Sequence, residues 1–401
     1  MVEWKTIEEL GSFFGGLTGK TKNDFVDGNA NFITYMNVFS NPSLNTSKVG
    51  TVKINEGEKQ NKIQKGDILF TGSSETPEET GMSCVVTDDL KEDFYMNSFC
   101  FGLRLYSPEQ VNLHYLKHIL RSEPVRKSIA KTASGVTRYN ISKARFSKIK
   151  LPIPSLSEQS RIVSILDTFT SSISNLKQQI EERRKQYEYE RDLLLDLEGK
   201  DEKDIHSWGE SCEIKKGNGV QKADFVEEGI GCIHYGQIYT YYGAYTYTTN
   251  KFVAKETFEK AKKASKGDII MTDTSENVED ICKSVAYLGE DDIAVSNHAL
   301  ILKHHQNPLF LSFSTQTNSF LTQKRKVVVG AKVSCIKPEH FAQIKIYLPS
   351  LEEQSRIVSI LDTFEQSISN LEEQLAMREK QYEYYRNQLL TFEGEEERGK
   401  T

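Results

Sequence analysis

The chain has 401 residues, of which 37% are hydrophobic and 27% are charged, and its formal net charge is −6. This length allows two or three domains with their own cores, and no apolar run approaches the roughly 18 residues that a membrane-spanning helix needs. Six widely spaced cysteines without a Cys-x-x-Cys pair argue against a zinc site or a disulfide framework. The first ten residues carry acids and no apolar core, so a signal peptide is not expected and a cytoplasmic location is.

Residues 1–153 are predicted to form a mixed α/β domain. Short apolar runs at 67–70, 83–86 and 99–105 are typical of strands, and a turn-rich segment at 71–81 separates the first two. The segment Phe13–Thr21 resembles a phosphate-binding loop, but Phe14 stands where the pattern requires glycine. A surface turn with an available lysine, Lys20, is the preferred interpretation.

A cationic stretch closes this region. From Pro124 to Ser157 there are eight basic residues and no acid, which favours a polyanionic partner over a merely solvated basic face. Within it, the segment 132–142 combines a glycine with hydroxyl, guanidinium, amide and aromatic groups. Such groups bridge phosphates and read base edges, with arginine favouring guanine and asparagine favouring adenine. The alternative is a basic loop that contacts only its own domain.

A long helix is predicted over residues 154–199. Ser155 can cap it, with Glu158 three residues later to complete a capping box. The apolar residues then follow a heptad seam, on which Arg183 also falls, where a polar residue costs stability but can fix the register. Gly199 suits the end of the helix.

Residues 200–348 repeat the N-terminal pattern. Residues 22–26, 33–37 and 65–68 are echoed at 222–226, 233–237 and 266–269, and strands are expected at 268–271, 284–288 and 299–302. From Ile293 to Pro338 there are six basic residues and no acid, and the loop 324–334 corresponds to the segment 132–142. Asn307-Pro-Leu-Phe310 resembles an amino-methyltransferase signature that lacks its second proline, and an ordinary turn is preferred.

Residues 349–394 repeat the long helix. They match 154–199 in 32 of 46 positions at an offset of 195, and a charged tail, 395–401, follows. Two such helices in one chain most simply pair with each other, and antiparallel pairing gives an approximate twofold axis. The predicted fold is therefore two copies of a mixed α/β recognition domain separated by two long antiparallel coiled-coil helices, with an internal pseudo-twofold repeat.

Several segments together resemble the specificity subunits of type I restriction-modification systems. They are the entries into the helices at 151–159 and 346–354, the two Lys-Gly-Asp-Ile motifs, the loop 135–141 and the helix endings at 185–191 and 380–386. The second loop departs from the family, because residues 330–334 lack the threonine of the first.

The resemblance implies a non-catalytic subunit in which each domain reads one half of a bipartite, asymmetric target in double-stranded DNA. It also implies two adenine methyltransferase subunits that use S-adenosylmethionine, and two restriction subunits that are ATP-driven translocases with a nuclease; Mg²⁺ is likewise expected on the partners. The cofactors would belong to these partners. The alternative from another class is a coiled-coil structural adaptor whose α/β domains bind peptides or glycans.

No catalytic or metal-binding residue is predicted in the chain. The residues predicted to contact DNA come from the repeated motifs, the turn segments and the two loops. In the first domain they are Lys20, Lys22, Tyr35, Asn37, Thr71, Ser73, Ser74, Lys131, Ser134, Gly135, Thr137, Arg138, Tyr139, Asn140 and Lys143. In the second they are Lys216, Asn218, Lys222, Tyr235, Gln237, Thr274, Ser275, Lys324, Arg325, Lys326, Gly330 and Lys332.

Overall fold

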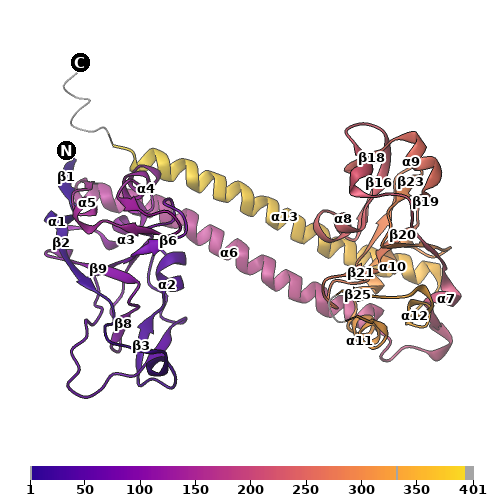
Figure 1. The fold of residues 1–401 in the computed structure, drawn as a ribbon, viewed down its shortest axis with the longest axis horizontal. Helices are drawn as coiled ribbons and strands as arrows, with labels where there is room; N and C mark the ends of the chain where they lie inside the picture. Colours follow the sequence, from indigo (N-terminus) through magenta and orange to yellow (C-terminus); the bar gives the residue numbers. More distant parts are fainter. Residues whose placement is uncertain (1, 331–332, 393–401) are drawn as a thin grey trace. The chain divides into compact units, whose positions relative to one another are not determined.

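The computed structural model describes residues 2–330 and 333–392, which form two compact units (Figure 1). Unit 1 comprises Met1–Lys177 with Glu373–Thr401, and unit 2 comprises Gln178–Glu372. Each unit combines a mixed α/β domain with one half of α6 (Leu156–Leu195) and one half of α13 (Leu351–Leu390).

The α/β domain of unit 1 contains a four-stranded antiparallel sheet in the order β2-β9-β5-β7, two three-stranded sheets in the orders β4-β3-β8 and β10-β11-β6, and a two-stranded sheet of β1 and β12. Its strands are β1 (Glu3–Thr6), β2 (Gly11–Gly15), β3 (Ala30–Ile33), β4 (Gly50–Val52), β5 (Ile68–Thr71), β6 (Ser73–Ser74), β7 (Ser83–Val85), β8 (Phe94–Met96), β9 (Cys100–Leu105), β10 (Ala133–Ser134), β11 (Tyr139–Ile141) and β12 (Lys150–Ile153). Its helices are α1 (Ile7–Leu10), α2 (Tyr35–Ser40), α3 (Leu113–Ile119), α4 (Glu123–Ala130) and α5 (Lys143–Phe146), with 3-10 turns at Lys22–Phe25 and Pro108–Gln110.

The α/β domain of unit 2 repeats this plan, with sheets in the orders β14-β24-β20-β22-β17 and β15-β18-β16-β23-β19. Its strands are β13 (Ile205–Ser207), β14 (Glu213–Lys216), β15 (Phe225–Val226), β16 (Ile230–Ile233), β17 (Tyr245–Thr246), β18 (Lys251–Val253), β19 (Lys262–Ala264), β20 (Ile269–Thr272), β21 (Thr274–Ser275), β22 (Ser284–Tyr287), β23 (Ile293–Val295), β24 (Ala299–Lys303), β25 (Ser334–Cys335) and β26 (Lys345–Tyr347). Its helices are α7 (Trp208–Ser211), α8 (Tyr235–Thr240), α9 (Lys255–Lys260), α10 (Pro308–Ser314), α11 (Asn318–Val327) and α12 (Pro338–Phe341), with 3-10 turns at Glu202–Asp204 and Lys222–Asp224.

The repeated Lys-Gly-Asp-Ile motif has the same role in both domains, because its aspartate anchors the central sheet. Asp67 is fully buried and binds Arg104 of β9 through two hydrogen bonds of 2.9 and 2.7 Å. Asp268 binds Lys303 of β24 at 2.7 Å. The strand that follows each aspartate is buried on both faces, as the apolar runs predict.

The first three residues of the false phosphate-binding loop, 13–15, lie in a strand. Residues 11–15 form β2, which pairs with β9 in antiparallel register, so that Phe13 lies opposite Leu103. The predicted surface turn is therefore wrong for this part of the segment. Asn307 is also more than a turn residue: its side chain caps α10 by accepting hydrogen bonds from the backbone N–H groups of Leu309 and Phe310.

The long helices begin where the sequence predicts. The Ser155 and Ser350 hydroxyls each accept a hydrogen bond at 3.3 Å from the backbone N–H of the glutamate three residues later. That glutamate does not complete a capping box; Glu158 instead binds Arg161, and Glu353 binds Arg356. The N-cap of each helix is confirmed, and its acidic partner stabilises the first turn through an (i, i+3) ion pair.

The two helices pair in antiparallel fashion in each unit, as predicted. In unit 1, Phe169 of α6 stacks on Tyr385 of α13, while Lys177 reaches back to Glu379. In unit 2, Arg184 binds Glu372, and Tyr187 packs against Phe364. Arg183, predicted on the seam, and its equivalent in the second repeat, Arg378, occupy equivalent places: Arg378 lies 5.7 Å from the centroid of the Phe169 ring, and Arg183 lies 5.7 Å from that of Phe364.

A buried glutamine docks each helix onto its domain. Gln159 is 1% exposed; its Oε1 accepts from the backbone N–H of Asn112, and its Nε2 donates to the carbonyl of Pro154. Gln354 makes the same two contacts with Asn307 and Pro349. Asn112 and Asn307 are in turn the N-caps of α3 and α10. These two hydrogen bonds are the structural role of the glutamine in the repeated Glu-Gln motif.

Candidate nucleic-acid interface

In unit 1 a small sheet brings two predicted segments together. Strand β6 of the turn-rich segment pairs with β11 of the cationic loop, with Tyr139 opposite Ser74 and Asn140 opposite Ser73, and β10 completes the sheet. The loop between β10 and β11 depends on Gly135, which has φ +154°, because a Cβ there would lie 2.0 Å from the carbonyl oxygen of Arg138. The tip beyond it is open to solvent, and Val136 is 89% exposed.

Arg138 is the centre of this surface. Its Nε donates to the Ser73 hydroxyl at 2.9 Å, and its guanidinium carbon lies 5.7 Å from the centroid of the exposed Phe99 ring. The Tyr35 hydroxyl of α2 donates to the Ser73 carbonyl at 2.7 Å. Among the described residues only its Nε donates a hydrogen bond, so the remaining donors of the exposed guanidinium can meet an acceptor-rich ligand.

A cleft of about 230 Å³ lies beside Arg138. Tyr35, Met36 and Phe39 of α2 form one wall, and Ser74, Glu75 and Glu79 belong to the segment after β5. The rings of Tyr35 and Phe39 stack at 6.0 Å. An arginine, a hydroxyl and aromatic rings therefore share one concave surface, which is the chemistry that base recognition uses.

The cationic stretch of unit 1 divides into structural and exposed residues. Arg126 donates to the carbonyls of Glu78, Thr80 and Gly81, and burial lowers its pKa to about 10. Arg145 donates to the carbonyl of Thr132, and Lys148 binds Glu8. Lys131 and Lys143 are exposed on either side of the loop, with the Lys143 ammonium 5.2 Å from the centroid of the Phe101 ring. These two, with Arg138, are the cations that the surface offers.

The corresponding place in unit 2 has different side chains. Strand β21 pairs with β25, so that Thr274 lies opposite Cys335 and Ser275 opposite Ser334. Gly330, with φ +117°, is subject to the same constraint as Gly135, because a Cβ there would lie 2.0 Å from the carbonyl oxygen of Val333. The glycine is thus kept, and three residues after it valine stands where the first loop has Arg138.

Asp273 organises the exposed polar groups of unit 2. It is 2% exposed and binds the Lys216 ammonium at 2.8 Å. The Thr274 hydroxyl donates to Asp273 at 2.9 Å and lies 3.2 Å from Nδ1 of His298. His298 is half exposed and is the positional equivalent of Phe99, since the backbone N–H groups of Asp273 and Gly72 donate to the carbonyls of His298 and Phe99 respectively.

The helix beside this cluster repeats the tyrosine contact of unit 1 with a shift of one turn. In α8 the hydroxyl of Tyr239, rather than that of the predicted Tyr235, donates to the carbonyl of Thr274 at 2.6 Å. The ring of Tyr235 instead lies 5.4 Å from that of His298 and 4.4 Å from that of His234. Gln237 is held by the backbone of His234 and by Asn250, and is only partly accessible.

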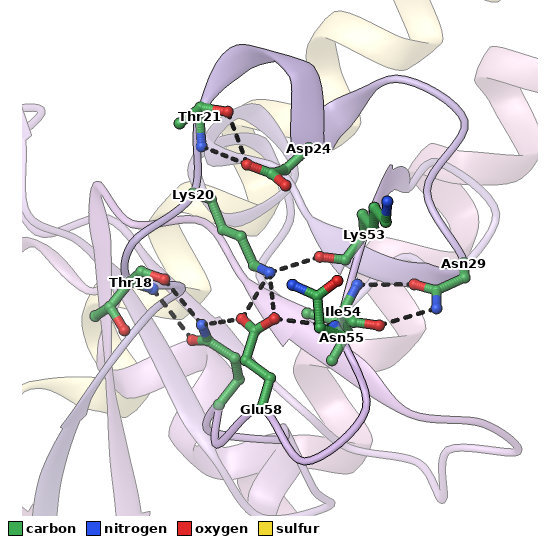
Figure 2. A network of polar contacts seen from close by, with 10 residues as sticks. Thr18, Lys20, Thr21, Asp24, Asn29, Lys53, Ile54, Asn55 and Glu58 are labelled. Atoms are coloured by element: carbon green, nitrogen blue, oxygen red, sulfur yellow. Dashed lines mark hydrogen bonds and ion pairs between the residues drawn. The ribbon is translucent and has the colours of Figure 1, made fainter.

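The structure corrects the assignment of Lys20, which is tied into a polar network (Figure 2). Its ammonium binds Glu58 at 2.6 Å and donates to the carbonyl of Lys53, and its side chain is 6% exposed. Gln60 and the backbone N–H of Asn55 also bind the Glu58 carboxylate. Because its two contacts hold the segment 53–60 to the loop before the first 3-10 turn, Lys20 stabilises the domain and is not presented to a ligand.

Three further assignments are corrected for the same reason. Lys324 is 2% exposed and donates to the carbonyls of Glu279 and Ile281 at 2.8 Å each, and burial lowers the pKa of its ammonium. Asn37 is 4% exposed and donates to the carbonyls of Asn45 and Lys48. Thr71 is fully buried in β5. These three side chains are buried within their domains and do not face solvent.

The other predicted residues have mixed positions. Ser73, Ser74 and Ser275 are nearly buried and orient their neighbours, whereas the following are exposed at the surface: Lys22, Ser134, Thr137, Asn140, Asn218, Lys222, Arg325, Lys326 and Gly330. The Asn218 carboxamide oxygen accepts from the backbone N–H of Lys262. Lys332 lies outside the described residues. Sequence reasoning missed Phe99, Asp273 and His298, although aligning the two domains along the strands that flank them would have placed Phe99 and His298 at one position.

Within residues 2–330 and 333–392, no group of three or more histidine, cysteine or acidic residues is arranged to hold a metal ion. None of the helices in the same ranges is both long and apolar enough to cross a membrane. The six cysteines, all of them described, are free thiols.

Comparison with known proteins agrees with this architecture. The sequence profile of the family described as "Type I restriction modification DNA specificity domain" matches residues 1–183 and 202–377. The specificity subunit of the type I restriction enzymes EcoR124I and EcoR124II of Escherichia coli is 30% identical over 277 residues, which cover 62% of this chain and 65% of that protein.

Two solved structures share the fold over nearly the whole chain. One, from a study of complex assembly and conformational transition of the type I restriction-modification system, has a TM-score of 0.62 at 16% identity and covers 97% of each chain. The other, the S subunit of a type I system from M. genitalium, has a TM-score of 0.53 at 17% identity and covers 98% of this chain and 97% of that one. Since the family profile matches both halves, this chain belongs to the family of type I restriction-modification specificity subunits, which are DNA-recognition proteins.

Proposed function

We propose that each α/β domain reads one half of a bipartite, asymmetric target in double-stranded DNA, unit 1 through the Arg138 surface and unit 2 through the Asp273–His298 surface. The observation that supports this proposal most strongly is that one strand framework presents different chemistry in the two domains. An arginine beside an aromatic ring suits the paired acceptors of guanine in the major groove. A threonine, an imidazole and a lysine offer other donors and acceptors, so the two half-sites are expected to differ in sequence.

The exposed lysines have a separate role in the proposal. Lys131 and Lys143 in unit 1, and Lys222, Arg325 and Lys326 in unit 2, are exposed on their domains. Phosphate contacts from such residues supply affinity without sequence preference and make binding depend on salt. Salt-insensitive binding in the presence of the partner subunits would instead favour the adaptor alternative.

The chain itself is proposed to carry out no chemistry. Two methyltransferase subunits with S-adenosylmethionine, and two restriction subunits with ATP and Mg²⁺, would assemble around it, and the paired helices would fix the separation between the half-sites. This agrees with the membership of the family.

The proposal is tested by changing one reading surface at a time. Arg138→Ala should weaken selection at one half-site by about 10- to 100-fold, the value of one bidentate base contact, and leave the other half-site unchanged. His298→Ala should relax only the other half. Genome-wide mapping of methylated adenines in cells that express each variant with its methyltransferase subunit measures both.

Lys148→Ala is the matched control. It removes a cation of the same stretch whose charge is already paired with Glu8, so the mapped sequence should not change. Equal loss of selectivity at both half-sites in Arg138→Ala would contradict the assignment of one domain to each half.

A further inference from the structure

Two ion pairs connect the long helices α6 and α13. In unit 1, Lys177 of α6 binds Glu379 of α13 at 2.9 Å. In unit 2, Arg184 of α6 binds Glu372 of α13. All four side chains are about half exposed, between 46% and 60%, so these contacts lie at the edge of the seam rather than in its apolar centre.

The two ion pairs occupy equivalent positions of the internal repeat, but the cation and the carboxylate change places between the two repeats. At the offset of 195, Lys177 corresponds to Glu372, and Arg184 corresponds to Glu379. Each repeat therefore has the same two contact positions, but α6 carries two cations there and α13 carries two carboxylates. The apolar seam does not differ in this way, because Arg183 over Phe364 and Arg378 over Phe169 are equivalent contacts.

We propose that this crossed charge pattern selects the partner of each helix: it favours pairing of one repeat with the other and disfavours pairing of either repeat with a second copy of itself. In the same antiparallel register, two α6 helices would place Lys177 against Arg184 twice. Two α13 helices would place Glu372 against Glu379 twice. Since 32 of 46 residues are shared, the apolar seam discriminates poorly between these pairings, and the charges supply the difference.

An aromatic contact acts in the same direction for α6. Phe169 stacks on Tyr385 at 5.2 Å in unit 1. The position of Tyr385 is occupied in the α6 repeat by Glu190. Pairing of α6 with its own copy would therefore replace an aromatic stack by a carboxylate against the Phe169 ring, whereas pairing of α13 with its own copy would keep an aromatic contact, so this difference disfavours only the α6–α6 pair.

The test inverts the pattern in the full-length chain. Arg184→Glu with Glu379→Arg puts Lys177 opposite an arginine within the chain and Glu372 opposite a glutamate. Between chains it places opposite charges at every α6–α6 and α13–α13 contact. The net charge is unchanged. We expect the dimer association constant, measured by sedimentation velocity at low salt, to rise at least about tenfold, which corresponds to about 1.4 kcal/mol, and to return toward the parent value in 1 M NaCl.

The matched control adds Lys177→Glu and Glu372→Lys to the same two substitutions. This four-site variant restores opposite charges within the chain and like charges between identical helices, so both its association constant and its stability to urea should match those of the parent. The two-site variant should be less stable than either. The proposal is overturned if the two-site variant has the same association constant and stability as the parent, or if the four-site variant fails to restore them.

Discussion

In unit 1 the pair of strands β6 and β11 presents Arg138 beside Phe99, whereas in unit 2 the corresponding pair, β21 and β25, presents Thr274 beside His298 and Asp273. The strand pairs beneath these side chains are equivalent in the two domains, and each loop has a glycine with positive φ at the same position. The duplicated domain has therefore kept the groups that hold the strands and changed those that face solvent. Contacts that match between the two domains indicate structure, and contacts that differ indicate recognition.

The buried cations of α4 and α11 are the matching contact with the largest expected effect. Arg126 donates to the carbonyls of Glu78 and Thr80, and Lys324 donates to those of Glu279 and Ile281, which are the equivalent positions. Replacing either by alanine should lower the stability of its own unit by about 3–5 kcal/mol, because buried carbonyls lose a charged donor. Hydrogen exchange resolved by mass spectrometry measures each unit separately.

Lys324→Arg is the control, because unit 1 already uses arginine for this contact, and it should retain most of the protection in β20 and β24. If Lys324→Ala left that protection intact but weakened DNA binding, the lysine would be a ligand of DNA after all and the comparison of the two domains would be broken.

Replacing the buried glutamines that dock the long helices should lower stability by a smaller amount, nearly equal for the two residues. Gln159→Ala and Gln354→Ala each leave a helix N-cap amide and a proline carbonyl without their partner. Each should cost about 2 kcal/mol, seen as faster hydrogen exchange in α3 for the first and in α10 for the second. Gln159→Glu keeps the acceptor and loses the donor, so an intermediate effect is expected. Strongly unequal costs would show that the two helices are docked by different interactions.

The sequence predicted the long helices, the central strands and the duplication, because periodicity and capping residues are local signals. It could not predict the order of the strands, which depends on pairings between residues far apart in the chain. The proposed reading surfaces follow only in part from the sequence. Arg138 was predicted because it lies in a cationic loop, but Asp273 and His298 lie in segments whose composition is ordinary.

The errors share one cause. Lys20, Asn37 and Lys324 were assigned to DNA by residue type, and each is satisfied inside the domain by a carbonyl or a carboxylate that a sequence does not bring close. A basic residue near a predicted interface is therefore weak evidence for a ligand contact until its intramolecular partners are known. The domain comparison gives that information where an alignment of the two halves is possible.

The smallest expected effect concerns the contact between the segment 53–60 and the loop before the first 3-10 turn. In unit 1, Lys20 and Glu58 form an ion pair, whereas unit 2 has the buried Val220 at the position of Lys20, packed near Ala261. The hydrogen bond from Lys20 lowers the pKa of Glu58 to about 2, and bonds from Asn55 and Gln60 add to it. Asp24 is the other carboxylate near Lys20, and its pKa is also lowered, by the Thr21 hydrogen bonds.

A carboxylate whose pKa is lower in the folded than in the unfolded state stabilises the fold above its unfolded pKa and stops doing so as the pH falls through its folded pKa. The protection factors of residues 53–60 against hydrogen exchange should therefore decrease between about pH 4.5 and pH 2, while those of 251–264 in unit 2 should change less, because an apolar contact takes the place of the ion pair there. Glu58→Gln should lower the protection of 53–60 already at pH 7 and flatten its dependence on pH, leaving only the contribution of Asp24. An equal decrease in the protection factors of both segments of the parent chain would contradict this prediction. It would mean that acid destabilises both segments through a group common to the two domains, and that having lysine in one domain and valine in the other makes no difference to how these segments are held.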